Sequence, residues 1–194
     1  MDLSPLTKLT TVSSSDSHGC FESNYIHTVT FSKAMILTSI ANRMFISNKI
    51  RTIDLSPLAL TSIGSYAFYD NAITSITWSK NITSLGVGAF KYNALTTVDL
   101  SPLTKLETLP SSTSHGCFES NSIYSITFTS SLTTIGDRAF MYNKIYSLSF
   151  AGLAKLTSVG YLSFYSSNIY TANFTGASKL TTIGEGNGLC IPYT

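Results

Sequence analysis

A His-Gly-Cys motif occurs twice, as His18-Gly19-Cys20 and as His115-Gly116-Cys117, and its residues are of types that could do chemistry. A cysteine thiolate near an imidazole can act as a nucleophile, and cysteine and histidine are common zinc ligands. Zinc is usually held by about four ligands, however, and each motif supplies two at most. Each cysteine also directly precedes a repeated phenylalanine, Phe21 or Phe118, which predicts a buried and unreactive thiol. We therefore expect no metal, no cofactor and no catalytic residue at these motifs.

The cysteines are also not expected to form a disulfide. Cys20 and Cys117 are 97 residues apart, a separation of four repeats. At about 4.8 Å per repeat the two residues are roughly 19 Å apart, which is beyond the reach of a disulfide. Cys190 falls in an irregular C-terminal tail.

The acidic residues do not form a catalytic pair either. Asp54 and Asp99 occupy the same outward position of two repeats, and Asp2 begins an equivalent Asp-Leu-Ser-Pro segment. Two strand spacings separate Asp54 from Asp99 by about 10 Å, too far for two carboxyl groups to share a proton. We interpret them as turn or surface charges and predict that the protein is not an enzyme. Two glycosylation sequons, which start at Asn81 and Asn173, are a pattern that is common by chance.

Composition narrows the class of protein further. The 194 residues are 43% hydrophobic and 11% charged, with a net charge of +2, so the chain can form a core but does not favour nucleic acid or an anionic membrane. No apolar run is long enough to cross a bilayer, and the first residues do not resemble a signal peptide. Because residues 2–9 restate residues 99–106, the chain starts within a repeat. We expect it to be a fragment of a longer protein whose targeting signal is missing.

These residues are positioned by a repeat. A phenylalanine recurs at intervals of 24, 23, 22, 28, 22 and 24 residues, which is typical of a solenoid. An asparagine follows three residues later in six copies, and the seventh copy is interpreted as shifted by one residue, to Asn168. We predict that the asparagines hydrogen-bond backbone groups that their own turns leave unpaired. The phenylalanines are Phe21, Phe45, Phe68, Phe90, Phe118, Phe140 and Phe164, and the asparagines are Asn24, Asn48, Asn71, Asn93, Asn121 and Asn143.

Each repeat contains two short segments with strand character. One follows the asparagine and reads Ile-x-x-Ile-x-Phe, as at 73–78, and the other reads Leu-Thr-x-Ile, as at 60–63. Two copies carry matching insertions before Phe21 and Phe118, so a four-repeat block has been duplicated. We predict a mainly β solenoid over residues 1–194, a single curved, right-handed coil of about eight turns of 22–28 residues. It should have two short strands per turn and no long helix.

One face of this coil is rich in hydroxyl groups. In the longer strand segment, the second variable position is Ser or Thr in every copy: Thr28, Thr52, Ser75, Thr97, Ser125, Ser147 and Thr171. The preceding position is Tyr124, Tyr146 and Tyr170 in the last three copies. Exposed tyrosines are favoured at interfaces, but an aromatic column can equally stabilise a sheet. A second set, Tyr69, Tyr92, Tyr142 and Tyr165, is interpreted as ordinary packing at the edge of the coil.

The repeats resemble the BspA-like leucine-rich repeats, most plainly at Ile63-Gly64-x-x-Ala67-Phe68 and Ile135-Gly136-x-x-Ala139-Phe140. The resemblance covers essentially the whole chain. It implies a surface or secreted protein, bacterial or from a protist, that is linked to adhesion.

Resemblance and composition together suggest a binding module for an extracellular protein or glycan. Its tentative site is Tyr124, Tyr146, Tyr170, Ser125, Ser147 and Thr171. The alternative is a structural spacer that projects another domain. Since neither end has a polar cap, we also expect end-to-end self-association.

Overall fold

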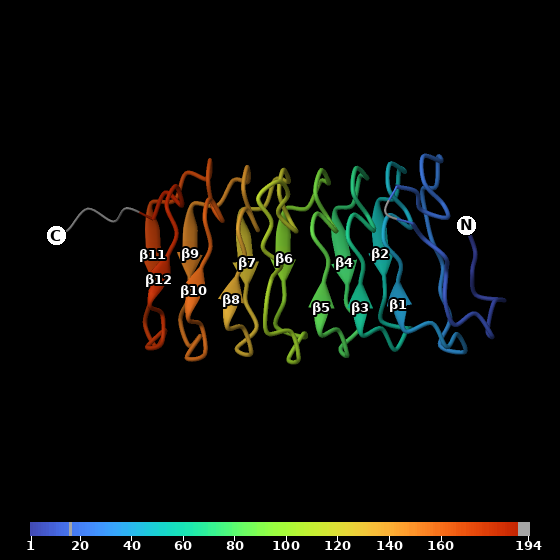
Figure 1. Ribbon diagram of the computed structural model, residues 1–194, viewed down its shortest axis with the longest axis horizontal. Helices are drawn as coiled ribbons and strands as arrows, with labels where there is room; N and C mark the ends of the chain where they lie inside the picture. The colour runs from blue at the N-terminus through green and yellow to red at the C-terminus, as the bar shows by residue number, and fades with distance from the viewer. Residues whose placement is uncertain (16, 190–194) are drawn as a thin grey trace.

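The protein is a parallel β solenoid, whose turns follow one another along a single long axis (Figure 1). The structure, a computed structural model, describes residues 1–15 and 17–189. Those residues form short strands and no helix. The strands are β1 (Ser39–Ile40), β2 (Thr52–Asp54), β3 (Ser62–Ile63), β4 (Ser75–Thr77), β5 (Ser84–Leu85), β6 (Thr97–Asp99), β7 (Ser125–Thr127), β8 (Thr134–Ile135), β9 (Ser147–Ser149), β10 (Ser158–Val159), β11 (Thr171–Asn173) and β12 (Thr182–Ile183).

The two predicted strand segments form two separate columns along the coil. The Leu-Thr-x-Ile segments pair in parallel as β1-β3-β5 and β8-β10-β12, and the longer segments pair as β2-β4, β6-β7 and β9-β11. In-register partners are equivalent residues, such as Ile53 and Ile76 or Val98 and Ile126. The prediction of a solenoid with two strands per turn is therefore confirmed.

The regular strands make about six turns, fewer than the eight predicted. The expected strand at 9–12 is not formed, and the segments at 26–31 and 106–109 contribute only single bridges, Asp2 to Thr30 and Thr108 to Thr134. The first segments lie at the end of the coil, where a strand has little or no neighbour on one side. The segment at 106–109 is followed directly by the insertion.

The repeated phenylalanines stack into one continuous column, which we call the phenylalanine ladder. All six successive ring pairs from Phe21 to Phe164 are stacked, with centroids 5.2–5.6 Å apart and interplanar angles of 2–19°. Six of the seven rings are fully buried, and Phe21 is half-buried at the N-terminal end. Because a single turn cannot bury its own apolar face, these contacts between turns hold the coil together.

The asparagines form a second column, the asparagine ladder, made of Asn48, Asn71, Asn93, Asn121 and Asn143. In each, Oδ1 accepts a hydrogen bond from a backbone N–H of the preceding turn, at 2.9–3.1 Å. Each Nδ2 donates to the ladder phenylalanine's carbonyl in that preceding turn, at 2.8–3.0 Å. The predicted role is confirmed for these five residues but is wrong for Asn24, which is exposed and whose Nδ2 donates to the Glu22 carbonyl of its own turn.

The predicted shift to Asn168 is wrong. Asn168 is exposed, while Ser167 lies three residues after Phe164 and two before Ile169, the spacing of every true ladder asparagine. The buried Ser167 hydroxyl has no hydrogen-bond partner among the residues that the structure describes. A serine side chain is too short to reach the groups that an asparagine amide reaches.

The prediction that both thiols are buried holds for Cys117 but is wrong for Cys20, which is exposed. Cys20 occupies the position of the buried Ala67 and Ala89, but the turn that would cover it on its N-terminal side is not regular. Burial raises the pKa of the Cys117 thiol far above its usual range. Cys190 lies outside the described residues.

Candidate binding face

The tyrosine column predicted from the sequence lies on the outside of the coil. Tyr124, Tyr146 and Tyr170 have exposed fractions of 54%, 50% and 82%. The rings of Tyr146 and Tyr170 are stacked, with centroids 6.3 Å apart and an interplanar angle of 11°. The Tyr170 amide donates to the Tyr146 carbonyl at 2.9 Å, and the pairing of β9 with β11 begins at the next residue. The backbone therefore holds these two rings in register.

The hydroxyl residues that follow the tyrosines are exposed as well. Thr171 lies opposite Ser147 in the parallel register, and its Oγ1 donates to Ser147 Oγ at 2.9 Å. Ser125 lies opposite Thr97 in the neighbouring strand pair. The structure thus brings Tyr146, Tyr170, Ser147 and Thr171 together and continues the same face through β7. We call this surface, with Tyr124 and Ser125, the tyrosine face.

A different hydroxyl column, on the other strand segment, was not singled out from the sequence. The threonine hydroxyls of the Leu-Thr-x-Ile segments donate to the backbone carbonyl of the preceding turn, at 2.9–3.2 Å. Those groups are therefore already used inside the coil. In the described chain, the hydroxyl of Ser125 makes no such bond to a backbone carbonyl. The threonines concerned are Thr61, Thr83, Thr133, Thr157 and Thr181.

The second set of tyrosines packs edge to face in two pairs. Tyr69 and Tyr92 are 5.3 Å apart at 88°, and Tyr142 and Tyr165 are 5.8 Å apart at 79°. Burial, and secondarily Tyr92, raises the pKa of the Tyr69 phenol. Tyr92, Tyr142 and Tyr165 are about half exposed and Tyr69 is half-buried, and the four rings do not form one column of parallel rings.

The second His-Gly-Cys motif is part of a polar cluster between turns. Lys91 forms an ion pair with Glu119 at 2.8 Å, with both side chains 5% exposed, and Lys91 Nζ lies 2.9 Å from His115 Nδ1. Glu119 also accepts a hydrogen bond from the Gly116 amide at 2.8 Å. Burial, and secondarily the Lys91 charge, lowers the pKa of His115. His115 therefore anchors the inserted loop. Within residues 1–15 and 17–189 no three His, Cys, Asp or Glu side chains are grouped so as to hold a metal ion.

The aspartates of the Asp-Leu-Ser-Pro segments close turns. The carboxylates of Asp2, Asp54 and Asp99 each accept a hydrogen bond from the amide two residues later, at 2.9 Å. The interpretation of these residues as turn charges is therefore confirmed.

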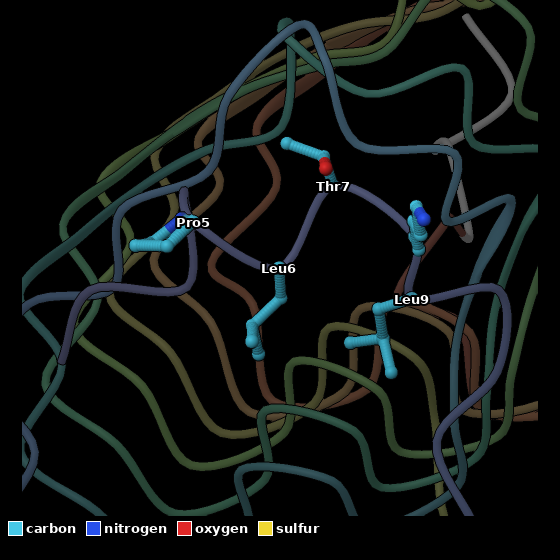
Figure 2. Close-up of a pocket in the computed structure, with 5 residues that line it drawn as sticks. Pro5, Leu6, Thr7 and Leu9 are labelled. Atoms are coloured by element: carbon cyan, nitrogen blue, oxygen red, sulfur yellow. The ribbon is translucent and has the colours of Figure 1, made fainter.

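A hollow at the N-terminal end is lined by five successive residues, 5–9, of the first turn. Figure 2 shows Leu6 and Leu9 extending to the same side of the chain, opposite Thr7. Leu6 is 47% exposed. Few polar groups converge on this hollow, so it does not have the composition of a ligand site.

No helix in the described chain could span a bilayer.

Comparison with known proteins identifies the repeat. The family model described as BspA type leucine-rich repeat region matches residues 7–113 and 107–186, in six copies. No curated protein matches the chain. Proteins with such repeats are typically surface binding proteins. Because the matched segments span nearly the whole coil, the chain belongs to the BspA-type leucine-rich repeat family.

Proposed function

We propose that this protein is a non-enzymatic binding module of the cell surface or of a secreted protein, and that the tyrosine face binds an extracellular protein or glycan. The observation that carries the proposal is the exposed stack of Tyr146 on Tyr170, continued by Tyr124, beside hydroxyl groups. Tyrosine offers a large, rigid contact area at a low cost in conformational entropy.

The surroundings of these tyrosines support this proposal. Each is followed directly by a serine or threonine, and the face carries no acidic or basic residue of its own. Recognition would therefore depend on aromatic contact and on neutral hydrogen bonds, which suits sugar hydroxyls or the polar rim of a protein surface. Family membership supports the coarser part of the proposal, a surface binding protein.

The test compares two triple variants on a panel of extracellular-matrix proteins and an array of glycans. The variant with Tyr124, Tyr146 and Tyr170 changed to Ser should bind the ligands of the unaltered protein at least tenfold more weakly, because stacked aromatic residues dominate such contacts. The matched control changes Tyr92, Tyr142 and Tyr165 to Ser. These are also about half exposed, at 46%, 47% and 43%, and belong to the second set.

Undiminished binding by the first variant would refute the tyrosine face as the site. A loss of binding by the control variant alone would assign the site to the second set of tyrosines instead. Circular dichroism of both variants checks that the coil is intact.

A structural spacer is the second candidate, and it is favoured by the phenylalanine ladder, whose seven rings stack without interruption from Phe21 to Phe164. A spacer needs rigidity but no ligand. This candidate predicts that the unaltered protein binds nothing on either panel, while an adjoining domain of the parent protein does.

A further inference from the structure

A polar hollow lies between two neighbouring turns, at the segments that connect β1 to β2 and β3 to β4. It has a volume of about 270 Å³ and is lined by Asn42, Arg43, Ser65 and Tyr66, which we call the Arg43 pocket. These residues precede Phe45 and Phe68 of the ladder and belong to neither strand column. The pocket is thus distinct from the tyrosine face.

The guanidinium group of Arg43 is held in a fixed place. Its Cζ lies 5.0 Å from the centre of the Tyr66 ring. The Tyr66 ring is itself confined, because a Cβ at Gly88 would come within 2.8 Å of two ring carbons, and the His115 ring packs edge-on at 5.4 Å. A guanidinium held in this way loses little freedom when it binds a ligand.

Within residues 1–15 and 17–189, no acidic side chain forms an ion pair with Arg43. The ion pair found in the described chain joins Lys91 to Glu119, and no carboxylate lines the Arg43 pocket. Asn42 Oδ1 accepts a hydrogen bond from the Ser65 amide at 2.8 Å, which fixes the Asn42 amide group. Its Nδ2 donates to no group of the described chain. The pocket therefore presents a cation and neutral donors.

An equivalent pair of residues in the duplicated block shows the opposite arrangement. Asp137 and Arg138 correspond to Asn42 and Arg43, and Asp137 Oδ1 accepts a hydrogen bond from the Tyr161 amide at 2.7 Å. Here a carboxylate replaces the amide, and Arg138 Nη1 contacts Met141 Sδ at 3.1 Å. The same backbone geometry thus accepts either Asn or Asp, and only the Asn42 copy suits an anion.

We infer that the Arg43 pocket binds the carboxylate of an acidic sugar. The flat guanidinium fork matches the two oxygens of a carboxylate, and its charge makes these hydrogen bonds strong. The Asn42 amide, the Ser65 hydroxyl and the Tyr66 phenol are neutral groups that suit the hydroxyls of the attached sugar ring.

Isothermal titration calorimetry with digalacturonic acid tests this inference, with its dimethyl ester as the uncharged counterpart. The acid should bind, and the ester should bind at least about tenfold more weakly, since it has no negative charge and no pair of equivalent oxygens for the guanidinium fork. Arg43→Gln and Asn42→Asp should each weaken binding of the acid by about tenfold or more. The control Arg51→Gln removes the same charge from an exposed residue directly before β2 and should leave the affinity within about twofold.

Each other outcome overturns the inference. It fails if the unaltered protein does not bind the acid, if the ester binds equally well, or if Arg43→Gln and Arg51→Gln have equal effects. A diglutamate peptide that binds as tightly as the sugar would refute the assignment to a saccharide. Thermal melting of the variants shows whether the coil persists, and Asn42→Asp should persist because Asp137 already makes the equivalent bond.

Discussion

Asparagine suits its repeated position because one short side chain carries both an acceptor and two donors. In the asparagine ladder, Oδ1 serves an N–H of the preceding turn while Nδ2 serves carbonyls of both turns, as Asn143 does with Phe118 and Phe140. Buried backbone groups that lack a partner are costly. Each amide therefore stabilises two turns at once.

Ser167 occupies a position that holds an asparagine in the other turns of the asparagine ladder, and this gives a prediction at the scale of a residue. Ser167→Asn should raise the free energy of unfolding by about 1 kcal/mol, because the new amide can reach the backbone groups that ladder asparagines bind elsewhere. Chemical denaturation measures the change. Asn168→Ser, which alters an exposed residue, should have no effect on the free energy of unfolding. A destabilising effect of that change would show that Asn168, and not the residue at position 167, belongs to the asparagine ladder.

Residues that repeat could be predicted from the sequence, and residues that depend on one particular neighbour could not. Phe68 and Asn71 are buried as expected because their types recur at the period of the coil. The exposure of Cys20 depends instead on the turn before it, which no feature of its own motif reveals. The contact between Arg43 and Tyr66 occurs in one pair of turns, so no repeated sequence position indicated it.

At the scale of an element, the second inserted loop is the most elaborate part of the coil. Residues 110–117 are held to the preceding turn by the cluster of Lys91, His115 and Glu119, with Arg138, Tyr66 and Tyr69 also close to the imidazole. His115 Nδ1 accepts from the Lys91 ammonium, so this contact requires an uncharged imidazole. The first loop has the same Ser and Glu contacts, from Ser15 to the His18 amide and from Glu22 to the Gly19 amide.

This arrangement predicts a pH dependence. The folded pKa of His115 is lowered, so the unfolded chain binds more protons in acid. The stability that the contact contributes is complete above the ordinary histidine pKa of about 6.5 and is lost as the pH falls through the lowered folded value. Denaturation curves between neutral and mildly acidic pH should show a steeper loss for the unaltered protein than for His115→Gln.

His18→Gln is the matched control for this measurement, because His18 occupies the same motif and is exposed. It should leave the pH profile unchanged. Equal profiles for the His115 variant and the unaltered protein would mean that the imidazole contact does not contribute to stability.

At the scale of the whole molecule, both ends of the coil show apolar side chains that interior turns cover. Leu6 is 47% exposed at one end and Ile183 is 44% exposed at the other. We propose that this chain associates end to end, since a ladder turn is stabilised by a neighbour on each side. Light scattering after size-exclusion chromatography should show a mass that rises with concentration.

Polar substitution at one end, Ile183→Lys, should reduce this association. A constant monomer mass at high concentration would contradict the proposal.

The fold was the most predictable part of the protein, because six copies of the repeat agree on where strands and core lie. The number of regular turns was less predictable, since end turns have the right residues but lack a partner.

Each ladder amide reaches back by one turn and never by two. The hydrogen bonds of any one turn therefore involve its immediate neighbours alone. Whole repeats can be added to the coil or removed from it without changes to the residues of the other repeats. A stretch of 97 residues copied in tandem, with its insertion intact, is what a chain with that freedom can accommodate.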